Sequence, residues 1–188
     1  NKIELTFNNK LSNLSPSNSS ILRNKTAILL DELYFELLDT LNIKYFIECG
    51  AYDAKNSYNL AVKSNIQAIA IEPNPNTFQE LTLKNNHPNV RLLNCGLSDK
   101  SGELNFYTPK DNNLAMNSSF RMKSNQDLDN YNISKIKVLK LDNIIEENLP
   151  KNSTFALWVD VEGLSDKVLF GCKNYLINKS VECQLIKI

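Results

Sequence analysis

The chain is short of glycine and histidine and has no excess of either charge, and each shortage excludes something. Of its 188 residues, five are glycine and one is histidine, while 21 basic residues balance 21 acidic ones. A net charge of zero argues against a nucleic-acid binder that relies on bulk positive charge, and against a polybasic membrane anchor. Since glycines are so few, each is expected to hold a turn. No apolar run is long enough for a signal sequence or a membrane span, so we expect a cytoplasmic location.

The four cysteines show no spacing typical of metal ligands. They are Cys49, Cys95, Cys172 and Cys183, and three of them lie in apolar runs. This pattern favours buried, reduced thiols of a cytoplasmic protein over a zinc site or a disulfide. We therefore expect no metal site.

The chain divides into a polar lead-in and one domain. Residues 1–25 are rich in serine and asparagine and predict an N-terminal arm, and residues 26–188 show one composition throughout and predict a single α/β domain. Thr26 is expected to cap a helix over residues 27–41, whose leucines share one face.

Short apolar runs alternate with helical segments along this domain. Strands are predicted at 45–49, 68–72, 90–95, 155–160 and 181–188, with helices at 54–64, 74–86 and 165–177. The alternation predicts βαβ units, hence a mostly parallel, doubly wound sheet covered on both faces. Two further strands, 103–108 and 136–141, predict a hairpin insertion around the polar stretch 109–134, which we expect to be a long lid or binding loop.

Three of the predicted strands end in acids: Glu48, Glu72 and Asp160. Ligands of open α/β sheets bind outside the carboxyl ends of the strands, so these acids are expected to converge on one crevice. A carboxylate at the end of the second strand can accept hydrogen bonds from both hydroxyls of a ribose. A dinucleotide fingerprint would need glycines at positions 50, 52 and 55, and only the first is present. The pattern therefore suits a nucleoside ligand without a diphosphate.

Five segments, in order, resemble the FkbM-type methyltransferases: FIECGAYDAKNS, AIEPNPNTFQEL, CGLSDKSGELNFY, LDNII and LWVDVEG. The resemblance covers about residues 44–172. It implies a Rossmann-like class I methyltransferase fold, with S-adenosyl-L-methionine as cofactor. Many members of the family methylate sugar hydroxyls, so the resemblance also implies O-methylation of a carbohydrate or a similar small molecule.

The resemblance also implies a set of cofactor-binding positions. Glu72 would hold the ribose diol, Ser57 would bind the cofactor carboxylate from a helix N-terminus, and Glu48 would act either as a direct ligand or as an acid that orients the turn. The loop from Leu97 to Asp99 would flank the adenine. The complete set is Glu48, Gly50, Ala51, Tyr52, Asp53, Ser57, Glu72, Pro73, Leu97, Ser98 and Asp99.

An alcohol is a poor nucleophile until a base removes its proton, so a positioned base is expected. His87, at a predicted helix end, is expected to be exposed, which leaves Asp160 and Glu162 of the Asp-x-Glu-Gly motif as the candidate catalytic residues. Two residues apart on an extended strand, they would share a face, and two nearby acids tend to separate their pKa values. Asp160 would contact either the cofactor ammonium or the acceptor hydroxyl. Glu162 has the alternative of bonding main-chain amides near Gly163.

Three departures from the family pattern keep a second function open. Ala54 replaces a usual glycine, Ser165 replaces a usual acid, and the chain stops at Ile188, within the fifth strand, where the family continues through a further strand pair. Alanine at position 54 is strained if its φ is positive. The alternative is a non-catalytic nucleoside-binding or interaction module that retains the fold. The last strand would need a partner copy, a missing C-terminal segment or the N-terminal arm to cover its edge.

Overall fold

The computed structural model describes residues 16–84, 87–110, 119–120, 128–178 and 181–186, and its contacts divide the chain into two units, residues 1–40 and 41–188. The first unit contains α2 (Pro16–Thr40), with Pro16 in its first turn, where proline is tolerated. The predicted helix start was wrong, because Thr26 lies inside α2 and its hydroxyl donates to the carbonyl of Leu22 at 2.9 Å. The expected arm over residues 1–25 stays a prediction for residues 1–15, which lie outside the described part. No helix among the described residues is both long and apolar enough to cross a membrane.

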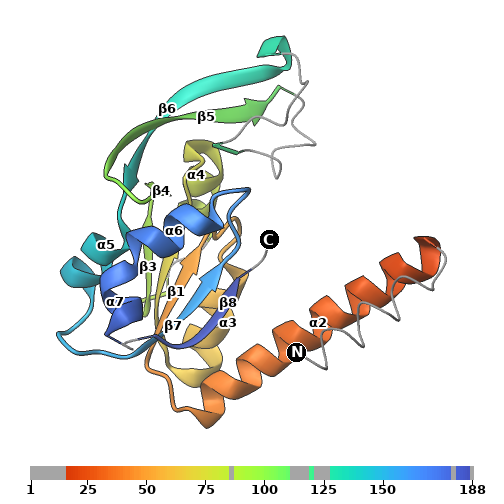
Figure 1. Cartoon of the computed structure of the whole chain (residues 1–188). Helices are drawn as coiled ribbons and strands as arrows, with labels where there is room; N and C mark the ends of the chain where they lie inside the picture. Colours follow the sequence, from red (N-terminus) through yellow and green to blue (C-terminus); the bar gives the residue numbers. More distant parts are fainter. Residues whose placement is uncertain (1–15, 85–86, 111–118, 121–127, 179–180, 187–188) are drawn as a thin grey trace. The chain divides into compact units, whose positions relative to one another are not determined.

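The second unit is built on a five-stranded parallel sheet in the order β3-β2-β1-β7-β8 (Figure 1). Its strands are β1 (Tyr45–Cys49), β2 (Gln67–Ile71), β3 (Val90–Leu93), β7 (Phe155–Val159) and β8 (Val181–Ile186), and its helices include α3 (Lys55–Ser64), α4 (Pro75–Lys84), α6 (Ser165–Gly171) and α7 (Lys173–Ile177). The predicted α/β class with a mostly parallel sheet is confirmed. The helix expected over 165–177 is two helices, which meet at Cys172.

The insertion forms a second, three-stranded sheet in the order β4-β6-β5. Its elements are β4 (Gly96–Leu97), β5 (Gly102–Pro109), the short 3-10 helix η2 (Leu128–Asn130) and β6 (Tyr131–Leu139), and α5 (Leu141–Asn148) follows. The antiparallel pairing of β5 with β6 confirms the predicted hairpin. Some boundaries were wrong: the strand expected over 90–95 ends at Leu93, and the one expected over 136–141 runs from Tyr131 to Leu139. The helix α5 was missed. Of the loop expected over 109–134, residues 111–118 and 121–127 lie outside the described part, and Pro109 belongs to β5.

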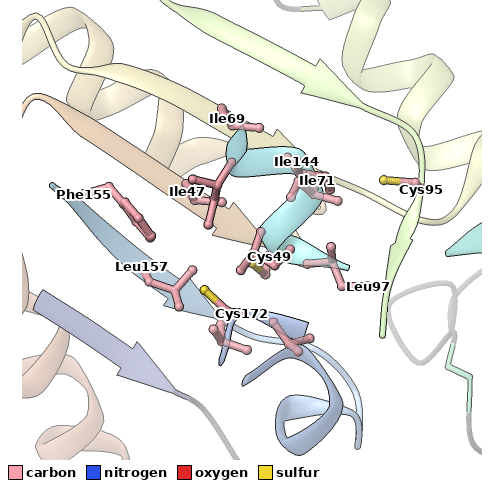
Figure 2. Packing of buried hydrophobic residues seen from close by; sticks show 14 residues of the cluster. Ile47, Cys49, Ile69, Ile71, Cys95, Leu97, Ile144, Phe155, Leu157 and Cys172 are labelled. Atoms are coloured by element: carbon pink, nitrogen blue, oxygen red, sulfur yellow. The ribbon is translucent and has the colours of Figure 1, made fainter. Parts of the chain in front are cut away.

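Alternate residues of the central strands enter two different cores, as the side-chain period of a strand requires. Ile47 and Cys49 of β1, with Leu157 of β7, pack against residues of α5, α6 and the α6–α7 junction, as Figure 2 shows for Ile144 and Cys172. On the other face, Ala70 of β2 packs with residues of α3 and α4. Because both faces are covered, the strands consist of nearly continuous apolar runs.

The chain order reverses between β1 and β7, which places a crevice at their carboxyl ends. There the two backbones come very close: the amide of Asp160 donates to the carbonyl of Cys49 at 3.0 Å, and a Cβ at Gly50 would collide with the carbonyl oxygen of Asp160. Gly50 also has a φ of +79°. A glycine is therefore required at this position for two independent reasons.

Two substitutions with opposite expected effects on stability test the backbone conformations at Gly50 and Ala54. Gly50→Ala should lower the free energy of unfolding by ~3 kcal/mol or more, because main chain and not a flexible side chain opposes the new Cβ. Ala54→Gly should raise it by up to ~1 kcal/mol, because Ala54 has a φ of +50° and only glycine takes that conformation without strain. Urea unfolding measures both changes. A loss below ~1 kcal/mol in Gly50→Ala would contradict the close approach.

Candidate functional site

A cavity of about 300 Å³ opens at the carboxyl ends of β1, β2 and β7. That volume lies at the lower end of the range for small-molecule sites. Ten of the thirteen residues predicted for the site line it: Glu48, Gly50, Ala51, Tyr52, Asp53, Glu72, Pro73, Leu97, Asp160 and Glu162. Ser57, Ser98 and Asp99 do not. The topology thus brings the three strand-ending acids together at one cavity.

Glu72, at the end of β2, is held by two main-chain amides. The amide of Tyr52 donates to its Oε2 at 2.9 Å, and the amide of Asn74 donates to its Oε1 at 2.8 Å. The side chain is buried, and desolvation raises its pKa, while the two amides oppose the rise. Each carboxylate oxygen has a further lone pair for another donor. Glu72 is therefore a fixed double acceptor at the cavity wall.

Glu48, at the end of β1, caps the N-terminus of α3. Its Oε2 accepts from the amide of Ser57 at 3.0 Å and from the hydroxyl of Ser57 at 2.6 Å, and its Oε1 accepts from the side chain of Asn56 at 2.9 Å. A carboxylate at this place is also favoured by the helix dipole. Both donors of Ser57 therefore serve Glu48, and the contact expected between Ser57 and the cofactor carboxylate stays a prediction.

Asp160 and Glu162 lie on the turn between β7 and α6. The strand ends at Val159, so the extended geometry expected for these two acids is absent. Both are nevertheless exposed to solvent and line the cavity, and the main-chain carbonyl of Glu162 accepts from the hydroxyl of Ser119 at 3.0 Å. His87 is half-buried, contrary to the exposure predicted for it, and lies outside the cavity lining, where its Nδ1 accepts from the amide of Asn89 at 3.2 Å.

Comparison with models of protein families gives a match to the methyltransferase FkbM domain over residues 48–188, which is three quarters of the chain. The chain belongs to the FkbM methyltransferase family. Neither the curated proteins nor the solved structures contain a match to it. The matched region begins at Glu48 and includes every residue predicted for the site.

The first loop of this FkbM domain takes three left-handed residues in alternation. Gly50, Tyr52 and Ala54 have φ values of +79°, +49° and +50°. Glycine is the residue that normally takes this conformation, and a side chain there costs about 1–2 kcal/mol. Because the φ of Ala54 is positive, the alanine that replaces the family's usual glycine is strained. Only one of the three left-handed positions in this loop is therefore occupied by glycine.

Ser98 and Asp99, expected beside the adenine, face another element. The hydroxyl of Ser98 lies 3.1 Å from Asp99, and the ammonium of Lys167 on α6 lies 3.3 Å from the same carboxylate. The carbonyl of Ser98 also lies against Gly171, where a Cβ would collide with it. These residues join β4 to α6 and are absent from the cavity lining.

Several residues that line the cavity were not predicted for the site: Asn56, Asn74, Thr77, Cys95, Phe106, Ser119, Phe120 and Trp158. Asn74, two residues after Glu72, and Trp158, on β7, are both buried. Ser119 and Phe120 lie in the stretch predicted to be a lid or binding loop, but nothing in its polar, aperiodic sequence distinguished these two residues. Their place depends on pairing with β5.

The cysteines lie in the core of the FkbM domain. Cys49, Cys95 and Cys172 are buried and outside any disulfide, as predicted, while the side chain of Cys183 lies outside the described part. Burial raises the pKa of Cys95 to about 11 and that of Cys172 to about 12, so both thiols stay protonated at neutral pH. The described residues contain no group of three or more side chains that could hold a metal ion.

Burial of Glu48 has a consequence for stability. Desolvation raises its pKa from 4.5 to about 7, against the opposing hydrogen bonds of Ser57 and Asn56. The folded state therefore binds this proton more tightly than the unfolded chain does. The free energy of unfolding should fall as the pH rises from about 4.5 to about 7, by up to ~3 kcal/mol from this group.

Glu48→Gln should flatten that slope, because glutamine does not titrate. Urea unfolding between pH 4 and 8 measures it, and Glu80→Gln, at an exposed position on α4, is the matched control that should keep the wild-type slope. Equal slopes in wild type and Glu48→Gln would show that Glu48 does not titrate in this range.

Proposed function

We propose that the chain is an S-adenosylmethionine-dependent O-methyltransferase that acts on a hydroxyl of a carbohydrate or a similar small molecule. Membership of the FkbM family supports methyl transfer. The cofactor supplies an electrophilic methyl group on a sulfonium, and the residues of the cavity fit a ligand of that kind. The acceptor's identity rests on the resemblance within the family.

The observation that carries the proposal is the fixed carboxylate of Glu72. Two amides, from Tyr52 and Asn74, orient its oxygens, and one lone pair on each oxygen is then left for the vicinal hydroxyls of a ribose. Since the carboxylate is oriented before a ligand arrives, little side-chain entropy is lost on binding.

The charge of the cavity wall supports a cationic ligand. Five carboxylate residues line it, and no lysine, arginine or histidine does so among the described residues. Such a wall attracts the sulfonium and ammonium groups of S-adenosylmethionine and repels a diphosphate. The acidic lining therefore disfavours binding of a nicotinamide dinucleotide, independently of the missing glycines.

The proposed acceptor base is Asp160 or Glu162. Both carboxylates lie at the cavity on a solvent-exposed turn, where an acceptor can approach. The base would take the proton from the acceptor hydroxyl as its oxygen attacks the methyl carbon. The Ser119 hydroxyl, bonded to the main chain of Glu162, restrains this turn.

A non-catalytic nucleoside-binding module remains the second candidate. The observation that favours it is the strained, left-handed backbone at Tyr52 and Ala54 in the loop beside the cavity. Binding of the nucleoside without turnover on any hydroxylated acceptor would support this second function.

Removal of the Glu72 carboxylate should weaken the affinity for S-adenosylmethionine. A hydrogen bond to a charged group contributes about 1.5–3 kcal/mol, so Glu72→Ala should raise the Kd by roughly 10- to 100-fold in calorimetry. Asp99→Ala is the matched control, because that acid was a candidate ligand and lies outside the cavity lining. The proposal fails if the wild-type protein shows no binding at millimolar cofactor, or if both variants lose affinity equally.

Replacement of the base should separate binding from turnover. With a panel of mono- and oligosaccharides and methyl-labelled S-adenosylmethionine, Asp160→Asn or Glu162→Gln should lower kcat by roughly 10²- to 10⁴-fold. The variant that removes the base should leave cofactor affinity within about threefold, because binding and proton removal are separate tasks. If an acceptor is found and both variants keep kcat within tenfold, neither residue is the base.

A further inference from the structure

The cavity has two chemically different sides. Its acids come from the ends of β1, β2 and β7, whereas Cys95, Leu97, Phe106 and Phe120 form an apolar side. These four residues come from the β3–β4 segment, from β5 and from the chain that pairs with β5. A nucleoside has the same division, with a polar sugar and a flat, largely apolar base.

Phe120 is held firmly within this apolar side. Its ring lies edge-to-face against Phe106, with centroids 4.8 Å apart and an interplanar angle of 62°. The ring also rests on Gly96, where a Cβ would collide with it. The lack of a side chain at position 96 is therefore what makes room for Phe120.

Ser119, next to Phe120 in the chain, holds the main chain in place through hydrogen bonds to two other segments. Ser119 exchanges two hydrogen bonds with Tyr107 of β5, at 2.9 and 3.0 Å, and its hydroxyl donates to the carbonyl of Glu162. The backbone that carries Phe120 is thus tied to the hairpin and to the turn of the candidate base. A ring fixed in this way presents a preformed surface to a ligand.

We propose that Phe120 is a ligand-contacting residue, whose ring, supported by Phe106 and Gly96, forms the apolar surface against which the purine base of the bound nucleoside packs. The inference rests on the proposed function, because it takes the ligand to be an adenine nucleoside. It reassigns the base contact from Ser98 and Asp99, which lie outside the lining, to the inserted sheet. Packing of a base on an aromatic ring contributes about 1–3 kcal/mol and needs a flat π-face.

The test compares ligands as well as variants. The Kd values of S-adenosylhomocysteine and adenosine are measured by calorimetry for wild type, Phe120→Leu and Phe120→Tyr. Phe120→Leu should weaken both ligands by the same factor, at least about fivefold, and Phe120→Tyr should stay within about threefold of wild type. Phe170→Leu, at a residue 64% exposed on α6, is the matched control and should change neither Kd.

Gly96→Ala gives a second, independent variant. Its Cβ displaces the Phe120 ring, so it should weaken both ligands in the wild-type background and have less effect when combined with Phe120→Leu. If Phe120→Leu fails to fold, Phe120→Met takes its place in the same comparison, because it also removes the aromatic face and keeps an apolar side chain of similar size.

The outcomes separate this inference from the proposed function. If wild type binds neither ligand, the proposed function fails, and the inference fails with it. If wild type binds both and Phe120→Leu binds them equally well, or loses affinity for S-adenosylhomocysteine alone, the base does not pack on Phe120 and only the inference is overturned.

Discussion

The hydrogen bonds of the Glu48 carboxylate determine where the cavity can form. That single side chain joins the end of β1 to the first turn of α3, through the amide and hydroxyl of Ser57 and the side chain of Asn56. The loop from Gly50 to Ala54 lies between these two anchored points, and its residues from Gly50 to Asp53 line the cavity. Tyr52 and Ala54 in this loop have strained, left-handed backbone conformations, and such conformations persist only where the surrounding structure holds them in place. The cap on α3 is one of those surroundings, and the close approach of Gly50 to Asp160 is another.

Three strand ends then give the site its chemical character. Parallel strands bring their carboxyl ends to one edge of the sheet, so acids at the ends of β1, β2 and β7 necessarily meet. Their roles differ because their surroundings differ. Glu48 accepts three hydrogen bonds from residues of α3, Glu72 is oriented by one amide on each oxygen, and Asp160 lies on an exposed turn. An acid that caps a helix, an acid proposed to bind the ribose and a candidate base thus follow from one topological feature.

Sequence reasoning found what local pattern determines and missed what tertiary pairing determines. β1, β2 and β7 were predictable because strands buried on both faces are apolar throughout. The helix α5 was missed because Leu141 and Ile144 continue the apolar run that ends β6, and a short run does not distinguish strand from helix. The hydrogen bonds between Ser57 and Glu48 were not predicted because the two residues lie nine positions apart on different elements. The position of Phe120 at the cavity was not predicted, because it depends on the pairing of the neighbouring Ser119 with Tyr107 of β5.

The most direct test of this account is a crystal structure of the protein soaked with S-adenosylhomocysteine. The account predicts both ribose hydroxyls within hydrogen-bond distance of the Glu72 carboxylate, with the amides of Tyr52 and Asn74 still bound to it. A ligand seated elsewhere, or a Glu72 side chain turned away from the ribose, would contradict it.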